Sequence, residues 1–350
     1  MLTLIEAGDT LVDGFRITGG VASTASEYGL LGGGVFVQGG TPTLSHLLVE
    51  GNDGTDPAAA DNAMVGGGIY VDADAVTIRD SVIRGNRSGR GAGVAAFSGR
   101  TRVLDNVIEG NEGVSDHGGG VYLAGPDIEV RGNRIAGNAI GRALGYGWGG
   151  GIIVFGDGSR ALLTGNEVTG NFAPSVGAGV FIDDEAVATL DHERIHHNLC
   201  GGATTGGVGV YVDGYDGRGS VVEIRASTIA GNDCASAQGG NALYVEGGSQ
   251  VTIRDSILWG NGGDDVLVVD DSSSVTATTT LPQEPIEGEG NLSADPLFVD
   301  LAAGDLRLRD GSPAIDAADP SSPFDLEPEP NGGRADLGAF GNTPDAGAAD

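Results

Sequence analysis

Three arginines and one glutamate in this sequence have a spacing that could place them on one surface. Arg84, Arg134, Arg194 and Glu167 fall at similar positions of a repeating pattern. A guanidinium forms two parallel hydrogen bonds with a carboxylate, so these arginines could pair with an acidic substrate. The alternative is a ladder of charge pairs that only fixes the register of neighbouring strands. We carry both interpretations forward.

A group of acidic residues follows two of the apolar runs. Asp183 and Asp184 lie in "FIDDEA", and Asp213 and Asp216 lie in "VDGYDGRG" one repeat later. Clustered carboxylates supply the acid and the base of glycoside hydrolysis. They also bind Ca²⁺, the one cofactor that we consider. The alternative is a hydrated acidic turn with no ligand.

The composition restricts the partners and the chemistry. The 18 basic residues are all arginine, lysine is absent, and the formal net charge is −31 at pH 7. Such a charge disfavours nucleic acid and anionic lipid as partners, and the absence of lysine excludes lysine-based catalysis. No apolar run approaches the ~18 residues of a membrane span. The opening "MLTLIEAGDTLVDGF" does not resemble a signal peptide, and we expect the chain to begin inside a domain.

A repeating unit must position all of these side chains. A glycine-rich segment leads into an apolar triplet, as in "GGGIYV" and "GGGVYL", and each unit closes on a motif such as "SVIRGN" or "NRIAGN". A third alternating run, such as "AVTIRD", lies between them. Three short strands per unit of 25 to 34 residues, without helical periodicity, predict one coil of a parallel β-helix. We expect about nine clear coils and a degenerate one at 265–291.

Polar residues recur at one turn of every coil. We predict that the amide side chains there form a ladder of hydrogen bonds between coils. The predicted ladder consists of Asn52, Asn86, Asn111, Asn138, Asn171, Asn198, Asn232 and Asn261. Cys200 and Cys234 each lie two residues after a ladder asparagine, so they should be stacked within disulfide reach. A disulfide indicates an oxidising compartment; the alternative is two buried thiols.

These repeats resemble the right-handed parallel β-helix proteins of the pectate-lyase-like superfamily, and in particular bacterial proteins with polymorphic outer-membrane-protein repeats. The segment "GNLSADPLFVDLAAGDLRLRDGSPAIDAADP" with "ADLGAFG" is similar to the end of choice-of-anchor Q surface proteins. The resemblance implies an all-β solenoid at 1–284, a capping segment at 285–341 and a disordered tail at 342–350. It implies a secreted or cell-surface location, and activities that range from polysaccharide lyase or hydrolase to non-catalytic adhesin.

The register of the coils predicts two outward rows. On the first strand of each coil the outward residues are mostly aromatic: Phe36, Tyr70, Tyr122, Phe181, Tyr211 and Tyr244. Exposed rings in a line would stack on the sugars of an extended polysaccharide, although a turn that folds over them would bury them instead. Tyr146 and Trp148 lie in one of the long turns that vary between coils, where solenoids often bind partners.

On the last strand the outward residues alternate in charge. Glu50, Arg84 and Glu109 form one run, and Arg134, Glu167 and Arg194 form another. From these patterns we expect a monomeric scaffold that binds a polysaccharide or another cell-surface polymer. The alternatives are a polysaccharide lyase or glycoside hydrolase, and an adhesive or structural rod.

Overall fold

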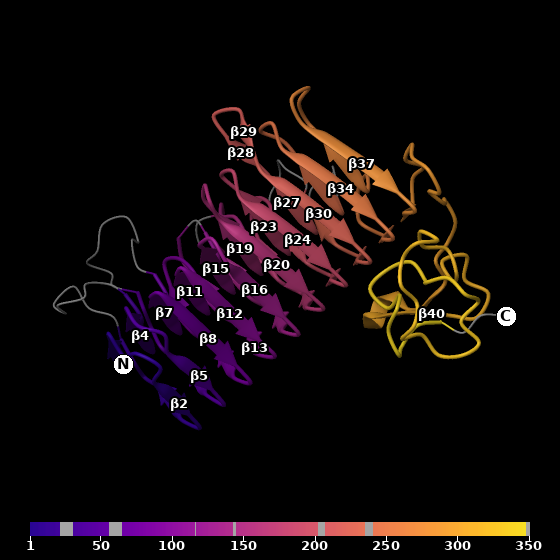
Figure 1. Ribbon diagram of the computed structural model, residues 1–350. Helices are drawn as coiled ribbons and strands as arrows, with labels where there is room; N and C mark the ends of the chain where they lie inside the picture. The colour runs from indigo at the N-terminus through magenta and orange to yellow at the C-terminus, as the bar shows by residue number, and fades with distance from the viewer. Residues whose placement is uncertain are drawn as a thin grey trace.

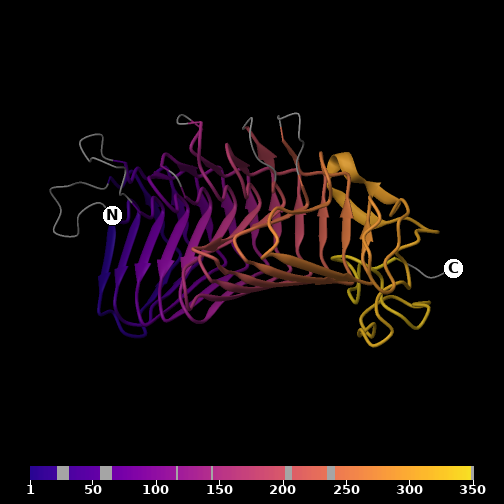
Figure 2. The same cartoon turned by 90° about the horizontal axis from the view of Figure 1, so that it is seen from above.

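The computed structural model describes residues 1–21, 31–55, 65–115, 117–142, 145–201, 207–234 and 241–347. Its strands wind into one elongated solenoid, with the N-terminus at one end and an irregular cap at the other (Figures 1 and 2). The three main sheets run along the solenoid, and each contains ten parallel strands. The predicted all-β parallel β-helix is therefore confirmed. One coil contributes one strand to each main sheet.

The first sheet holds the strands that follow the glycine-rich segments. Its order is β1 (Leu2–Ile5), β4 (Val35–Gln38), β7 (Ile69–Asp72), β11 (Val94–Phe97), β15 (Val121–Ala124), β19 (Ile152–Phe155), β23 (Val180–Asp183), β27 (Val210–Val212), β33 (Leu243–Val245) and β36 (Val266–Val268).

The second sheet holds the middle strand of each coil. Its order is β2 (Leu11–Asp13), β5 (Thr43–Ser45), β8 (Ala75–Arg79), β12 (Arg100–Leu104), β16 (Ile128–Arg131), β20 (Arg160–Thr164), β24 (Val187–Asp191), β30 (Val221–Arg225), β34 (Gln250–Arg254) and β37 (Ser274–Thr278).

The third sheet holds the short strands before the ladder asparagines. Its order is β3 (Arg16–Thr18), β6 (Leu48–Glu50), β9 (Val82–Arg84), β13 (Val107–Glu109), β17 (Arg134–Ala136), β21 (Glu167–Thr169), β25 (Arg194–His196), β31 (Thr228–Ala230), β35 (Ile257–Trp259) and β38 (Leu281–Pro282). We number the coils one to ten by these strands.

A fourth, shorter sheet follows the asparagines in six coils. It contains β10 (Arg87–Ser88), β14 (Glu112–Gly113), β18 (Ala139–Ile140), β22 (Phe172–Ala173), β26 (Leu199–Cys200) and β32 (Asp233–Cys234). Separately, β28 (Gly214–Tyr215) and β29 (Arg218–Gly219) form an antiparallel hairpin that projects from the turn after β27.

The core is made by the inward side of all three main sheets. Because successive strand residues point to opposite faces, the alternating runs place one aliphatic side chain per pair inside the solenoid. Val121 and Ile135, for example, are completely buried, as their register predicts. Each inward residue stacks on its counterpart one coil away, such as Val94 on Val121 and Ile108 on Ile135. Burial of these stacked aliphatic columns stabilises the solenoid.

The predicted asparagine ladder is present. The Nδ2 of Asn86 donates to the Oδ1 of Asn111 at 2.9 Å, and the same oxygen accepts the backbone N–H of Asn86 at 3.0 Å. The Nδ2 of Asn86 also donates to the carbonyl of Val49. The pattern continues from coil to coil to Asn261, which donates to Asp265. The ladder satisfies buried turn backbone that water cannot reach.

A second polar ladder, which we did not predict, lies between the second and third sheets. Asn106 donates to Asn133, and Asn133 donates to Asn166, at 3.0 and 2.9 Å. The next position is Glu193, whose Oε1 accepts from the Nδ2 of Asn166 at 2.7 Å. Ser227 then donates through its backbone to Ser256. The signal was the first letter of "NVIEGN", "NRIAGN" and "ERIHHN", which varies in identity and so escaped notice.

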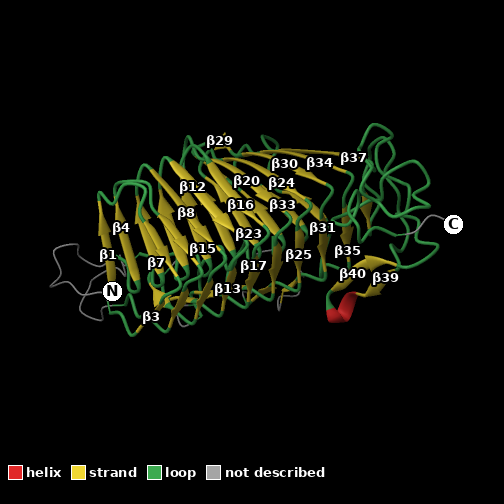
Figure 3. Cartoon of the chain, turned by 60° about the horizontal axis from the view of Figure 1, so that its bottom comes forward, coloured by secondary structure: helices red, strands yellow, loops and turns green. Residues whose placement is uncertain are grey.

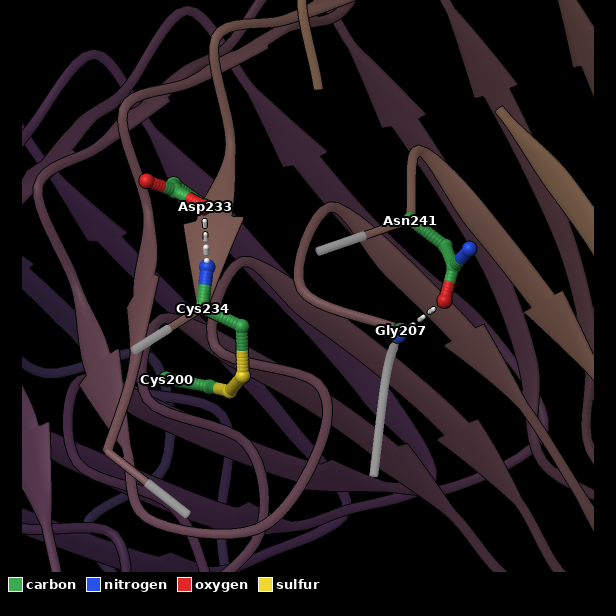
Figure 4. Close-up of a disulfide and its surroundings, with 5 residues drawn as sticks. All are labelled: Cys200, Gly207, Asp233, Cys234 and Asn241. Carbon is green, nitrogen blue, oxygen red and sulfur yellow. Dashed lines mark hydrogen bonds between the residues drawn. A yellow bond between two sulfur atoms is a disulfide. The ribbon is translucent and has the colours of Figure 1, made fainter. Parts of the chain in front are cut away.

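The disulfide between Cys200 and Cys234 is also present, and the two cysteines pair in register on β26 and β32 (Figure 4). Their Cα atoms are 4.5 Å apart. The prediction from equal spacing after two ladder asparagines is confirmed. The bond covalently joins coil seven to coil eight at the fourth sheet.

The cap follows the tenth coil and covers the far end of the third sheet. It contains the antiparallel strands β39 (Phe298–Asp300) and β40 (Asp305–Leu308) and the 3₁₀-helix η2 (Leu301–Ala303), beside β35 (Figure 3). Its apolar residues pack on the outward residues of coils eight to ten. The contacting set is Ala230, Ile257 and Leu281 from the solenoid, and Phe298, Leu306, Ala314, Ala318, Ala335 and Leu337 from the cap.

Residues 342–347 pack against the cap, where we expected part of a disordered tail. The backbone N–H of Asn342 donates to Glu327 at 2.6 Å, and that of Gly347 donates to Asp336 at 2.7 Å. These carboxylates satisfy the turn backbone, which orders the segment. Residues 348–350 lie outside the described residues.

Candidate functional site

An open groove runs along the outer face of the third sheet over coils one to six. Its volume is about 900 Å³. We call it the charged groove, because its lining includes Arg16, Glu50, Arg84, Glu109 and Arg134. The other lining residues are small: Thr18, Gly51, Gly85, Gly110, Ala136, Gly137, Thr169 and Gly170. Small floor residues and long charged residues together form a polar channel along the solenoid.

Glu50 is the best-paired carboxylate in the charged groove. Its two oxygens accept from Arg16 at 2.5 Å and from Arg84 at 2.7 Å. Hydrogen bonds from Arg84, and then from Arg16, lower the pKa of Glu50 below its usual value. Glu50 is therefore an anion at neutral pH, held between one cation from each neighbouring coil.

Arg134 is held more loosely. Its guanidinium lies 3.6 Å from Glu109 in coil four and 3.4 Å from Glu167 in coil six. Glu167 also lies 3.4 Å from the Nε2 of His196. The hydrogen bond from His196 is the main reason that the pKa of Glu167 is lowered. Loose ion pairs of this kind leave guanidinium N–H groups for an incoming ligand.

The glycines that end the third-sheet strands keep one side of the groove open. Gly85, Gly110 and Gly137 have φ of +59°, +61° and +62°, in the left-handed region that glycine adopts without strain. A Cβ atom at any of the three would meet nothing within 4 Å. The edge of the groove is thus bare backbone, and a ligand could approach it closely.

The cap closes the groove after coil six. The Arg194 guanidinium lies 5.7 Å from the ring centroid of Phe340, in the cap. A Cβ atom at the cap residue Gly304 would lie 2.9 Å from the His196 ring, which shows how tightly this end is filled. Of the predicted catalytic candidates, Arg84 and Arg134 therefore line the groove, Glu167 follows them on the next strand, and Arg194 lies at the closed end.

The acidic candidates lie elsewhere, at the ends of first-sheet strands. Asp183 ends β23, and Asp213 directly follows β27 one coil later. Burial raises the pKa of Asp213 to about 6, and burial also raises the pKa of Asp183. The hydroxyl of Tyr211 donates to Glu246 in the next coil. These groups form a partly buried acidic cluster on a different sheet from the charged groove.

The acidic cluster lacks a metal-binding arrangement. Asp184 and Asp216 occupy tight-turn positions with φ of +58° and +54°. In the part of the chain that the structure describes, no three His, Cys, Asp or Glu side chains are placed to hold one metal ion. The Ca²⁺ hypothesis for Asp183, Asp184, Asp213 and Asp216 therefore gains no support.

The aromatic row points outward, as predicted, but it is covered. The exposed fractions are 2% for Phe36, 6% for Tyr122, 2% for Phe181, 5% for Tyr211 and 8% for Tyr244, and Tyr70 is only partly exposed. The rings pack on one another instead, with centroids 5.6 Å apart for Phe36 and Tyr70. Of the two alternatives that the sequence left open, the structure has the one in which the rings are covered.

The glycine-rich turns explain this burial. Each turn folds back over the ring that follows it, so a Cβ atom at Gly66 would lie 2.6 Å from the Cβ of Tyr70. The same holds at Gly177 and Phe181, at 2.8 Å. The repeated glycines therefore allow the turn to lie on the aromatic row. Binding of sugars by these six rings loses its geometric support.

A smaller aromatic surface remains accessible near the ends of first-sheet strands. Phe97 and Phe155, which we did not single out, pack against Tyr122 and are partly exposed. They line a groove of about 610 Å³. Their signal was an aromatic residue at the end of "GVAAF" and "GIIVF". Tyr146 is 50% exposed and contacts the partly exposed Trp148, so this predicted pair is accessible.

Much of the predicted set of long turns lies outside the described residues. This applies to most of the turns at 21–31, 53–65 and 199–206, and to part of 139–148. In the described ranges, no helix is long and apolar enough to cross a membrane.

Comparison with known proteins identifies the fold family and nothing finer. Neither the curated proteins nor the solved structures contain a match to this chain. The family described as "Right handed beta helix region" matches residues 67–177 and 150–281, which together exceed half of the chain. The matched residues include most of the coils that carry both ladders and the charged groove. The chain belongs to the right-handed β-helix family.

Proposed function

We propose that this chain is a secreted or cell-surface scaffold that binds an extended polysaccharide along the charged groove. The observation that carries the proposal is the shape and lining of this groove: it is open, about 900 Å³ in volume, and follows the axis over six coils. Guanidinium and carboxylate groups are strong partners for sugar hydroxyls. A linear polymer fits a channel of this form better than a compact ligand does.

The ion pairs of the groove do not oppose binding. Exposed pairs contribute only about 0–1 kcal/mol each, so a ligand can replace them at little cost. Arg84 and Arg134 are 49% and 48% exposed. The same side chains can therefore support the register of the coils when the groove is empty and bind a polymer when it is filled.

The disulfide supports the proposed location. Structural disulfides persist in oxidising compartments and are rare in the cytosol. Cys200 and Cys234 are paired in register, which makes the disulfide the observation that supports an oxidising compartment.

A glycoside hydrolase remains the second candidate, because of the acidic cluster. A carboxyl with a pKa of about 6, as at Asp213, is a suitable general acid. However, Asp213 follows a first-sheet strand, whereas the charged groove lies on the third sheet. A polymer in the groove would not reach this carboxyl. We therefore expect binding without cleavage.

A blocked groove tests the proposal. Ala136 is an outward residue on β17 that lines the groove, and Ala136→Trp would fill the groove at coil five. Leu162→Trp is the matched control, because Leu162 is an outward, 40% exposed residue of the second sheet. Binding of fluorescent polysaccharides by the wild type and by Leu162→Trp, with loss in Ala136→Trp, supports the proposal.

Two other results would contradict the proposed binding of polysaccharide in the charged groove. Equal binding by Ala136→Trp would place the site elsewhere, for example at Phe97 and Phe155. Release of reducing ends from the polymer, lost in Asp213→Asn, would establish the hydrolase instead.

A further inference from the structure

The charges of the third sheet alternate in sign through seven consecutive coils. Each coil has two outward positions on its third-sheet strand, and each of coils one to seven carries one Arg or Glu there. In order these are Arg16, Glu50, Arg84, Glu109, Arg134, Glu167 and Arg194. The sign never repeats between neighbouring coils. The first five of these side chains, from Arg16 to Arg134, line the open groove, whereas Arg194 lies at its closed end.

This alternation sets a spacing along the groove. Parallel strands in neighbouring coils are ~4.8 Å apart, so arginines two coils apart repeat every ~10 Å along the solenoid axis. Arg84 lies two residues further along its strand than Arg16 and Arg134, so the three arginines form a zigzag along the groove. An extended sugar residue is about as long as one coil is high. Arg16, Arg84 and Arg134 are therefore spaced by two sugar residues, and each intervening sugar faces a glutamate.

From this spacing we infer the class of polymer that the charged groove selects. We infer that it binds a linear polysaccharide with a carboxylate on every second sugar and with hydrogen-bond donors, such as an amide N–H, on the sugars between. This inference rests on the proposed function. The formal net charge of −31 repels a polyanion at long range, so the selection rests on short-range contacts: each carboxylate meets one of the exposed arginines, and each neutral sugar donates to Glu50 or Glu109.

The glutamates also define what the groove rejects. A polymer with a carboxylate on every sugar would place every second one against Glu50 or Glu109. Both glutamates lie in the groove, and the pKa of Glu50 is lowered by its arginine partners, so it stays charged. Like charges in contact without a cation between them are unfavourable, which is a common source of specificity. A neutral polymer, in turn, offers the arginines no carboxylate beyond the glutamates of the groove with which they already pair.

Three oligosaccharides of equal length test this inference by titration calorimetry. Hyaluronan octasaccharide has a carboxylate on alternate sugars, an oligogalacturonate octamer has one on every sugar, and a chito-oligosaccharide has none. We expect hyaluronan octasaccharide to bind about tenfold more tightly than either of the others. Affinity should rise up to the hexasaccharide, which reaches three arginines, and then level off.

Matched variants separate the roles of the charges. Arg84→Gln should weaken hyaluronan binding about tenfold and leave binding of the chito-oligosaccharide unchanged. Arg131→Gln is the control: Arg131 is 47% exposed and lies near carboxylates, but on the second sheet. Glu109→Gln should improve binding of oligogalacturonate, a gain that a purely structural role of Glu109 does not predict.

The outcomes distinguish this inference from the proposed function. If oligogalacturonate or the chito-oligosaccharide binds as tightly as hyaluronan, and Ala136→Trp abolishes that binding, the groove binds polysaccharide but the charge rule is wrong. If no oligosaccharide binds in a manner sensitive to Ala136→Trp, both the proposed function and the charge rule fail.

Discussion

The outer faces of the first and third sheets carry comparable outward rows in opposite surroundings. Phe181 on the first sheet is 2% exposed, whereas Arg84 on the third is 49% exposed. On the first sheet, Gly177 leads into the strand and lies over the ring of Phe181. On the third sheet, Gly85 follows the strand, and a Cβ atom placed there would meet no other atom within 4 Å. The direction of a side chain is set by the strand, but its exposure is set by the neighbouring turn.

Removal of a covered ring should have the largest effect. Phe181→Ala deletes a buried side chain that packs on Tyr211 at a centroid distance of 5.1 Å. Loss of this packing, together with the cavity left behind, should lower the free energy of unfolding by about 3–5 kcal/mol. Thermal unfolding monitored by circular dichroism would measure it. A loss below about 1 kcal/mol would mean that the first-sheet face is open after all.

The insertion of a large ring should cost more stability on the first-sheet face than on the third-sheet face. Ile153 and Ala136 are both outward residues in the middle of the solenoid, on the first and third sheets. Ile153 is completely buried beneath its turn, so Ile153→Trp should overpack the site and cost about 1–3 kcal/mol. Ala136 is itself only 7% exposed, but it lines the open groove, so the ring of Ala136→Trp can extend into solvent and should cost less stability than Ile153→Trp. Similar melting temperatures for the two variants would contradict the comparison.

The buried and open carboxylates should respond to pH in opposite directions. Burial raises the pKa of Glu193 from 4.5 to about 8, so the folded state keeps a proton that the unfolded state releases. Stability from this group is complete below pH 4.5 and is lost as pH rises toward 8. Glu193→Gln should therefore raise the free energy of unfolding at pH 8 by up to about 4 kcal/mol and have little effect at pH 4.5.

Glu50, with its lowered pKa, contributes in the opposite sense: its pairing is present above its unfolded pKa and is lost in acid. Melting temperatures from pH 4 to 9 for the wild type, Glu193→Gln and Glu50→Gln would compare the two. A wild-type slope that survives in Glu193→Gln would show that another group causes the alkaline loss.

The smallest effect on stability should come from the charged groove itself. Arg84→Ala removes an exposed ion pair with Glu50 and should cost less than about 1 kcal/mol. Its melting temperature should differ from that of the wild type by no more than a few degrees, in contrast to Phe181→Ala. A large loss would show that the charge row holds the coils together, which would weaken its proposed role in binding.

Repetition explains which features were predictable. Asn86 and Asn111 recur with unchanged identity, so the ladder, the coil register and the pairing of Cys200 with Cys234 follow from spacing alone. The second ladder changes identity from Asn166 to Glu193 to Ser227 and escaped notice. A position that keeps its role while its residue type changes from coil to coil leaves only a weak pattern in the sequence.

Other features depend on segments that the repeat does not describe. The register placed Arg84 and Arg134 on one face, but the groove exists because the cap stops at coil seven and leaves them open. The burial of Tyr122 depends on the path of a glycine-rich turn. Glycine accepts many backbone conformations, so its presence does not fix that path.

The direction of the asparagine ladder has a consequence for how such a rod can change in length. Each amide donates to the next coil and accepts from the previous one, so deletion of a single coil would rejoin the ladder without a gap. The alternating charges of the third sheet, in contrast, depend on whether the number of deleted coils is odd or even. Loss of residues 112–138 would bring Glu109 against Glu167, whereas loss of 87–138 would bring Arg84 against Glu167 and keep the alternation. The ladder tolerates any number of coils, but the charge row keeps its alternation only when coils are gained or lost in pairs.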